Sequence, residues 1–250
     1  MEWNPFKVTD QEKQMSRSSI ARLAGLCYLI LVVTGIFHLI YVPTQLIDWG
    51  DAARTVNNIT NGEFLFRAGI VVGILSYIAY LILPLILYRL LESVDRTQAV
   101  VMVALAVVSV PVSLFSMVYK VDVLSVLSGA EYLNAHSSEQ IHAQVMSLLK
   151  SYNNTISVVQ IFWGLWLFPF GYLVFRSGFL PRVLGVLLML GCFGYLIRFF
   201  GYHLFPDVDI PSFVRLPGSL GEIGTCLWLL IMGARDEPDA SAGASAHEQV

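Results

Sequence analysis

Charged residues are scarce in this sequence, and their scarcity is its most informative feature. Only 13% of the 250 residues are Asp, Glu, Lys or Arg, whereas soluble domains carry about 25%. Apolar residues make up 56% of the chain and are gathered in long runs. This pattern argues against a soluble globular domain and indicates a protein whose solvent is lipid.

Several other features are missing, and each absence argues against a class of function. No basic stripe occurs and the formal net charge is only −3, so we expect no nucleic-acid partner. Cys27, Cys192 and Cys226 lie inside apolar runs without CxxC spacing, which is typical of packed thiols. Neither an HExxH nor a GxSxG motif is present, so zinc proteolysis and serine hydrolysis are not indicated. We expect no metal and no cofactor.

Six apolar runs have the length of a membrane helix. Each supplies close to the ~20 residues that cross ~30 Å of hydrocarbon at 1.5 Å per residue. The runs are Ile20–Val42, Phe64–Leu91, Thr97–Tyr119, Thr155–Phe175, Pro181–Leu204 and Ser212–Ala234. Continuous runs favour helices, because barrel strands are shorter and alternate in polarity. The predicted fold class is all-α, a polytopic membrane helix bundle with six transmembrane helices.

The distribution of Lys and Arg predicts the orientation of the bundle. If the N-terminus is cytoplasmic, that side carries Lys7, Lys13, Arg17, Arg22, Arg89, Arg96, Arg176, Arg182 and Arg235. Most of the remaining basic residues lie in or beside predicted helices, so the positive-inside rule places both termini in the cytoplasm. We therefore predict a cytoplasmic segment over residues 1–18, a transmembrane domain over 19–235 and a disordered cytoplasmic tail over 236–250.

The longer connections face the outer side. The first, "PTQLIDWGDAARTVNNITNGE", is expected to be irregular or shallowly helical. In the second, Ser137 and Gln140 fit a capping box that starts a helix. This helix either lies at the membrane interface or extends the fourth transmembrane helix outward.

Polar side chains gather in the outer halves of the predicted helices, while the inner halves carry few. A charge at mid-bilayer costs roughly 2.5–3.5 kcal/mol on insertion scales, so these groups should face the bundle interior. The expected lining of an outward-facing pocket is His38, Arg67, Tyr77, Lys120, Gln160, Arg198, Tyr202 and Glu222. The alternative is that they are interhelical clamps that bind no ligand.

Glu222 stands inside the last apolar run and is expected to form the floor of this pocket. We expect it to lie within hydrogen-bonding or ion-pair reach of a basic or tyrosine side chain. Arg198 and Arg67 are the first candidates. The last helix also carries Gly218 and Gly221, which permit close approach of a neighbouring helix.

Three segments in order carry a resemblance to a known family: "SGAEYLNAHSSEQ", "GYLVFRSGFLPRVLGVLLMLGCFGYLI" and "GEIGTCLWLLIMGAR". From about Ser16 to Arg235 the chain resembles the bacterial integral membrane family catalogued as domain of unknown function 4386. The resemblance implies a prokaryotic membrane protein of about six helices, and it supplies no reaction and no catalytic residue.

Three functions are compatible with these features. The first is binding or transport of a small anionic or amphipathic molecule, because arginines in a pocket favour carboxylate or phosphate groups. The second is a membrane enzyme that acts on a lipid or isoprenoid at the outer leaflet, with Glu222 as acid or base. The third is a structural or regulatory partner of another membrane protein. For all three we expect the bacterial inner (plasma) membrane as location and the lipid bilayer as partner.

Overall fold

The computed structural model describes residues 16–129, 137–205 and 207–234, and within these ranges all regular structure is helical. Most of the predicted N-terminal segment and the whole of the predicted tail lie outside the described residues. The elements are α1 Arg17–Ile36, η1 Phe37–Tyr41, α2 Val42–Leu46, α3 Ala52–Asn61, α4 Glu63–Leu91, α5 Arg96–Leu127, α6 Ser138–Leu165, α7 Leu167–Arg176, α8 Arg182–Leu204, η3 Ser212–Arg215 and α9 Leu216–Ile231.

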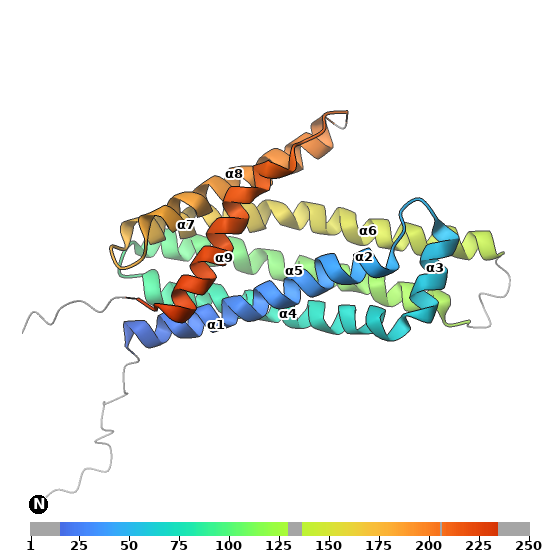
Figure 1. Ribbon diagram of the computed structural model, residues 1–250, viewed down its shortest axis with the longest axis horizontal. Coiled ribbons are helices and arrows are strands. Elements are labelled where there is room, and N and C mark those ends of the chain that lie inside the picture. The colour runs from blue at the N-terminus through green and yellow to red at the C-terminus, as the bar shows by residue number, and fades with distance from the viewer. Residues whose placement is uncertain (1–15, 130–136, 206, 235–250) are drawn as a thin grey trace, which may run out of the picture.

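Four long elements, α1 with α2, α4, α5 and α6, run alongside one another (Figure 1). Helices α8 and α9 are tilted across them, and α8 diverges from α6 toward its C-terminal end (Figure 1). Helix α9 packs on both α8 and α1. We call the end of the bundle that carries α3 the outer end, because it is predicted to face outward.

Five segments are long and apolar enough to cross a membrane: Arg17–Leu46, Glu63–Leu91, Arg96–Leu127, Ser138–Arg176 and Arg182–Leu204. To this extent the prediction of a helical membrane protein is confirmed. The sixth predicted span corresponds to η3 and α9. Helix α9 has only 16 residues, or about 24 Å at 1.5 Å per residue, so the sixth crossing stays a prediction.

The outer connections are more helical than their polarity alone suggests. Helix α3 begins after Asp51, whose carboxylate accepts a hydrogen bond from the Arg54 backbone N–H. The predicted capping box is present, since Ser137 and Gln140 exchange side-chain-to-backbone hydrogen bonds. Helix α6 runs from this cap to Leu165 without interruption, so it extends the fourth transmembrane helix outward rather than lying on the membrane surface.

Two irregularities in the long helices follow from proline. Pro169 has no N–H to offer the carbonyl of Leu165, and the boundary between α6 and α7 falls at Trp166. Pro43 likewise leaves the carbonyl of Leu39 without its usual donor, and the preceding turn is the π-helix η1. In that π-helix His38 is fully buried.

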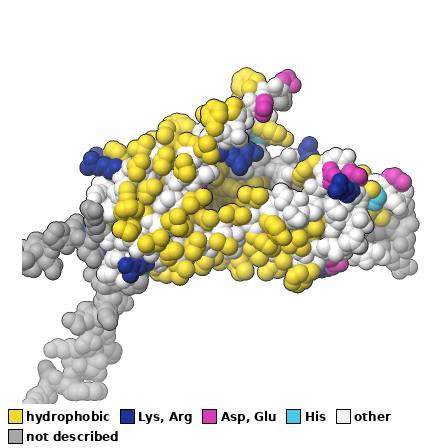
Figure 2. All heavy atoms as spheres, in the orientation of Figure 1, with side chains coloured by type: hydrophobic (Ala, Val, Ile, Leu, Met, Phe, Trp, Pro, Cys, Tyr) yellow, Lys and Arg dark blue, Asp and Glu magenta, His cyan; other side chains and the backbone are white. Residues whose placement is uncertain are grey.

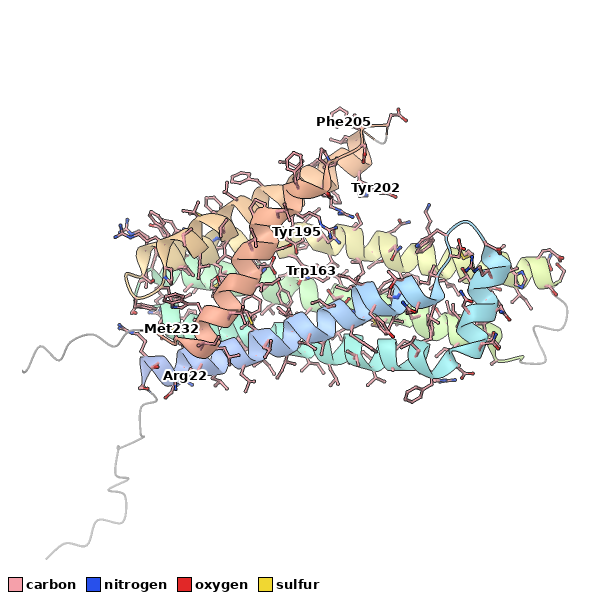
Figure 3. All side chains as sticks on the ribbon, viewed as in Figure 1. Arg22, Trp163, Tyr195, Tyr202, Phe205 and Met232 are labelled. Atoms are coloured by element: carbon pink, nitrogen blue, oxygen red, sulfur yellow. The ribbon has the colours of Figure 1, made fainter. Side chains whose placement is uncertain are left out.

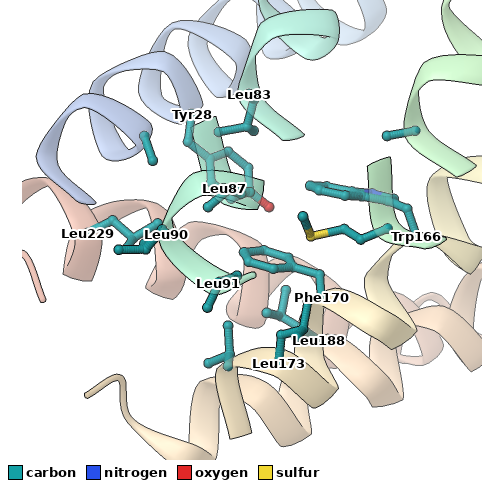
Figure 4. Close-up of a cluster of buried hydrophobic side chains, with 14 of the residues drawn as sticks. Tyr28, Leu83, Leu87, Leu90, Leu91, Trp166, Phe170, Leu173, Leu188 and Leu229 are labelled. Carbon is teal, nitrogen blue, oxygen red and sulfur yellow. The ribbon is translucent and has the colours of Figure 1, made fainter. Parts of the chain in front are cut away.

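The core of the inner half is apolar and tightly packed. Leucines of α4 and α7 meet the aromatic rings of Trp166 and Phe170, and Tyr28 projects among them (Figure 4). Trp166 and Phe170 stack with ring centroids 5.2 Å apart. Glycines then allow backbones to touch, because a Cβ at Gly25 of α1 would collide with the backbone of Leu230. Helix α9 is therefore fixed against α1 near the inner end.

Candidate functional site

A groove begins where α8 parts from α6. The two helices touch at Gly164, where an added Cβ would lie 2.6 Å from the Cβ of Tyr195. Beyond this contact α8 leans away from α6 (Figure 1). The divergence opens a pocket of about 360 Å³ toward the outer end.

This outer groove is lined largely by polar side chains of α6, together with one residue of α8. Its lining residues are Trp49, Met146, Lys150, Asn153, Asn154 and Tyr202. In the same region the surface is hollowed between α9 and α2, beside a group of Lys and Arg side chains (Figure 2). Tyr195 and Trp163 lie toward this hollow, and Tyr202 lies farther along α8 (Figure 3).

Glu222 lies on α9 and is not among the residues that line the groove. It is partly buried on α9, and its Oε1 accepts a hydrogen bond from the Tyr195 hydroxyl at 3.5 Å. Tyr28 of α1 and Tyr80 of α4 lie near enough to interact electrostatically with the carboxylate. The Tyr28 hydroxyl is buried without a hydrogen-bond partner in the described chain. The Tyr80 hydroxyl forms no hydrogen bond of good geometry there but lies near the Ser109 hydroxyl. Glu222 thus does face the bundle and meets a tyrosine, but the expected arginine ion pair is not formed.

Three cations have no carboxylate partner in the described chain: Lys150, which lines the groove, and Arg198 and Arg215 on α8 and η3. Arg198, Arg215 and Lys150 are exposed, and none lies within 4.0 Å of an acidic side chain in the described ranges. The positive charges of Arg198 and Arg215 are close enough to affect each other. Arg198 follows Tyr195 by one helical turn and Tyr202 follows by another, so the three residues share one face of α8.

Arg67 is not among the residues that line the groove, and its partner is on its own helix. Its guanidinium is exposed and pairs with Glu63 on the preceding turn of the same helix, at 2.6 Å. A surface ion pair four residues apart satisfies an arginine at the end of a helix without any partner from the bundle. Because α4 is apolar on nearly all sides, its sequence does not show whether Arg67 faces the bundle interior or the surface.

His38, Tyr77 and Lys120 form a second group, away from the groove. Lys120 of α5 is buried and places its Nζ 4.1 Å from the ring centroid of Tyr152. The rings of His38 and Tyr77 meet edge to face at 5.3 Å. Trp163 stands between the two groups, since its ring lies 6.3 Å from those of both Tyr77 and Tyr80.

The structure therefore divides the predicted lining into two sites. Tyr202 lines the groove, and Arg198 lies one turn before it on the same face of α8. Glu222 lies on α9 beside Tyr195, and Gln160 lies partly buried on α6, one turn beyond Gly164 toward the outer end. Reasoning from single helices gave no role to Tyr152 or Trp163, which complete the second group from α6. Their positions relative to the other residues depend on the rotation of each helix about its axis. The spacing of residues along the sequence does not determine this rotation.

Unpaired polar atoms are concentrated in these two sites. Eight buried side-chain nitrogen and oxygen atoms of the described chain form no hydrogen bond of good geometry, and seven of them belong to residues already named. Such atoms are rare in folded proteins unless water or a ligand satisfies them. No three His, Cys, Asp or Glu side chains of the described ranges are grouped as metal ligands would be.

Comparisons with known proteins give one family match and one partial relative. The family model described as Domain of unknown function (DUF4386) matches residues 23–233. An "Uncharacterized protein" of the archaeon Archaeoglobus fulgidus is 32% identical over 91 residues, which are 35% of this chain. The match spans about half the length of that relative, 51%. No solved structure matches the chain.

Proposed function

The chain belongs to the family described as Domain of unknown function (DUF4386), and we propose that this member binds or transports a small anionic or amphipathic molecule in its outer groove. The protein would reside in the bacterial plasma membrane as a six-span protein with both termini in the cytoplasm. In this orientation the groove opens to the outer leaflet and the outer aqueous phase.

The observation that carries the proposal is the pair of unneutralised arginines beside the groove. Arg198 and Arg215 interact as like charges and have no carboxylate within 4.0 Å in the described chain. Like charges held close together favour an anion between them, and guanidinium groups bind carboxylate and phosphate in a bidentate manner. Glu222 stays engaged with Tyr195, so it does not neutralise them.

The apolar surroundings of the groove favour a ligand with a hydrophobic part. Phe200, Leu204, Phe205 and Phe213 are all exposed at the outer ends of α8 and η3. Clusters of exposed apolar side chains at a helix tip contact lipid or an apolar ligand. A molecule with an anionic head at Arg198 could therefore place its tail along α8 and enter from the bilayer.

Arg198→Ala tests this function. The full-length protein is purified in mild detergent, and its co-purified small molecules are identified by mass spectrometry alongside its melting temperature. We expect an anionic molecule in the wild type and at least a tenfold lower content in the variant, since one charge-assisted contact contributes about 1.5–3 kcal/mol. The melting temperature should change little, because Arg198 is exposed and forms no ion pair.

Arg67→Ala provides the matched control. It removes the same charge from an exposed position near the outer end, where only the ion pair with Glu63 is lost. The ligand content of this variant should equal that of the wild type. If the wild type carries no ligand and Arg198→Ala lowers the melting temperature, the groove residues are structural clamps and the proposal fails.

The isolated carboxylate supports a second candidate function, a membrane enzyme that acts on a lipid or isoprenoid at the outer leaflet. Glu222 is partly buried and has a single tyrosine partner in the described chain, as an acid or base would. The same mass spectra test this reading. An enzyme would be recovered with two related molecules that differ by one reaction, whereas a binding protein or transporter holds its ligand unchanged.

A further inference from the structure

We propose that a second site, enclosed within the bundle and separate from the groove, holds one small anion of about the size of chloride. The site is formed by His38, Tyr77, Lys120 and Tyr152, contributed by η1, α4, α5 and α6. We call it the Lys120 site. It extends beyond the function proposed for the groove and does not depend on it.

Lys120 is the first reason for an anion. Its side chain is only 3% exposed, and no acidic side chain of the described ranges lies within 4.0 Å of its Nζ. In the described chain its Nζ lies 4.1 Å from the centroid of the Tyr152 ring, over the face of that ring. A ring face attracts a cation more weakly than an anion does. A buried charge without a counter-ion is strongly unfavourable, so a counter-ion is expected here.

The surrounding polar atoms are the second reason, because they are rich in donors and contain no carboxylate. Both ring nitrogens of His38 are buried without a hydrogen-bond partner in the described chain. The hydroxyls of Tyr77 and Tyr152 form no hydrogen bond of good geometry there, although they lie near each other and that of Tyr77 also lies near the Ser116 hydroxyl. Ser116, one turn before Lys120, already donates its hydroxyl to the Ser113 carbonyl at 2.6 Å. An ammonium group, two phenols and an imidazole N–H can all point hydrogen atoms at one anion.

The four residues are neighbours of one another in the bundle. Lys120 touches Tyr152, Tyr152 and Tyr77 belong to one buried cluster, Tyr77 meets His38, and the charges of His38 and Lys120 interact. Gly73 is part of this arrangement, because an added Cβ would lie 3.0 Å from His38 Nδ1. His38 therefore sits directly against the α4 backbone.

The burial of these residues restricts the kind of anion. His38 is 0% exposed and Tyr77 2%, so a lipid headgroup or a large organic anion has no room to enter. A monoatomic halide needs only a few donors at van der Waals distance and fits a closed site. Trp163 separates the Lys120 site from Tyr80 and the Glu222 region, so occupation of one site need not affect the other.

The test compares melting temperatures of the purified full-length protein in sodium chloride and in sodium gluconate of equal ionic strength. Gluconate is too large for the site. At about ten times the dissociation constant we expect chloride to raise the melting temperature of the wild type by roughly 3–5 °C. Lys120→Met should abolish this rise, and in gluconate it should melt no lower than the wild type, because an uncompensated buried charge has been removed.

Arg67→Met is the control for net charge, since it removes one exposed positive charge near the same end. It should keep the full chloride response. An equal melting temperature of the wild type in both salts would overturn the proposal, and so would a chloride response in Lys120→Met as large as that of the wild type. If the Lys120→Met variant does not fold, the Tyr152→Phe variant is used in the same measurement. Removal of one donor should raise the half-saturating chloride concentration at least threefold, and an unchanged value would again contradict the site.

Discussion

Glu222 shows how a single ionisable residue is accommodated among membrane helices. Its carboxylate meets the Tyr195 hydroxyl, while Tyr28 and Tyr80 stand nearby. Tyrosines supply donors without adding a second charge, so the desolvation cost of the site is that of one group only. This arrangement leaves Arg198 unneutralised and free to face the groove.

Tyr195→Phe is expected to destabilise the protein by about 1 kcal/mol, because Glu222 loses its one hydrogen-bond donor in the described chain. The bond is long at 3.5 Å, so a larger effect is not expected. Thermal unfolding in detergent measures the change. Tyr41→Phe, which removes a hydroxyl from an exposed ring, should stay within about 0.5 kcal/mol of the wild type. Equal effects of the two substitutions would show that Tyr195 does not support Glu222.

At the scale of elements, the position of α9 is set by glycines rather than by large side chains. A Cβ at Gly191 of α8 would lie 2.6 Å from the Cα of Gly218 on α9. A Cβ at Gly221 would lie 2.9 Å from the backbone nitrogen of Leu188. Close backbone approach of this kind is the usual way for membrane helices to pack tightly. It also fixes the height and rotation of Glu222 relative to Tyr195.

Gly191→Ala should therefore destabilise the protein by about 1–3 kcal/mol, since backbone atoms of α9 have to move to admit the methyl group. The displacement should also loosen the contact between Glu222 and Tyr195. Gly35→Ala is the control, because a Cβ there meets nothing within 4 Å. That substitution should stabilise α1 by about 0.5–1 kcal/mol through helix propensity. Thermal or denaturant unfolding of both variants under identical conditions distinguishes the outcomes, and a neutral Gly191→Ala would contradict the packing argument.

For the whole molecule, the distribution of arginine predicts which end of the bundle faces the cytoplasm. The described arginines at the C-terminal ends of α4 and α7, and those at the starts of α1, α5 and α8, belong to connections at the inner end. Short loops rich in arginine stay in the cytoplasm. The outer groove, α3 and the Lys120 site would then lie toward the outside.

Single cysteines introduced at Gly50 and at Ser245 test this orientation in intact cells with a membrane-impermeant maleimide. Gly50 precedes α3 and is exposed, and Ser245 belongs to the predicted cytoplasmic tail, outside the described residues. We expect labelling at Gly50 only. The unsubstituted protein is the control, since its three cysteines lie within α1, α8 and α9 and are buried or partly buried, so they should not react. Labelling at Ser245 and not at Gly50 would reverse the orientation, and labelling at both would mean that α9 does not complete a sixth crossing.

The sequence by itself determined the class of the molecule and much of its local structure. Continuous apolar runs specify membrane helices, because lipid leaves backbone groups no partner except each other. The capping box at Ser137 and Gln140 specified where α6 begins, since a cap depends only on neighbours three residues apart. The concentration of polar side chains toward the outer end could also be predicted from the sequence, because it depends only on the position of each residue along its helix.

Only the tertiary structure decided which of these polar groups meet. Periodicity gives the faces of a helix but not its tilt or its rotation against a neighbour. The tilt of α8 away from α6 opens the groove, and the rotation of α9 brings Glu222 to Tyr195 instead of Arg198. Arg67 forms an ion pair with Glu63 of its own helix. Lys120 of α5 contacts the ring of Tyr152 on α6. One predicted pocket became two sites because contacts between helices depend on packing in three dimensions, which spacing along the chain does not encode.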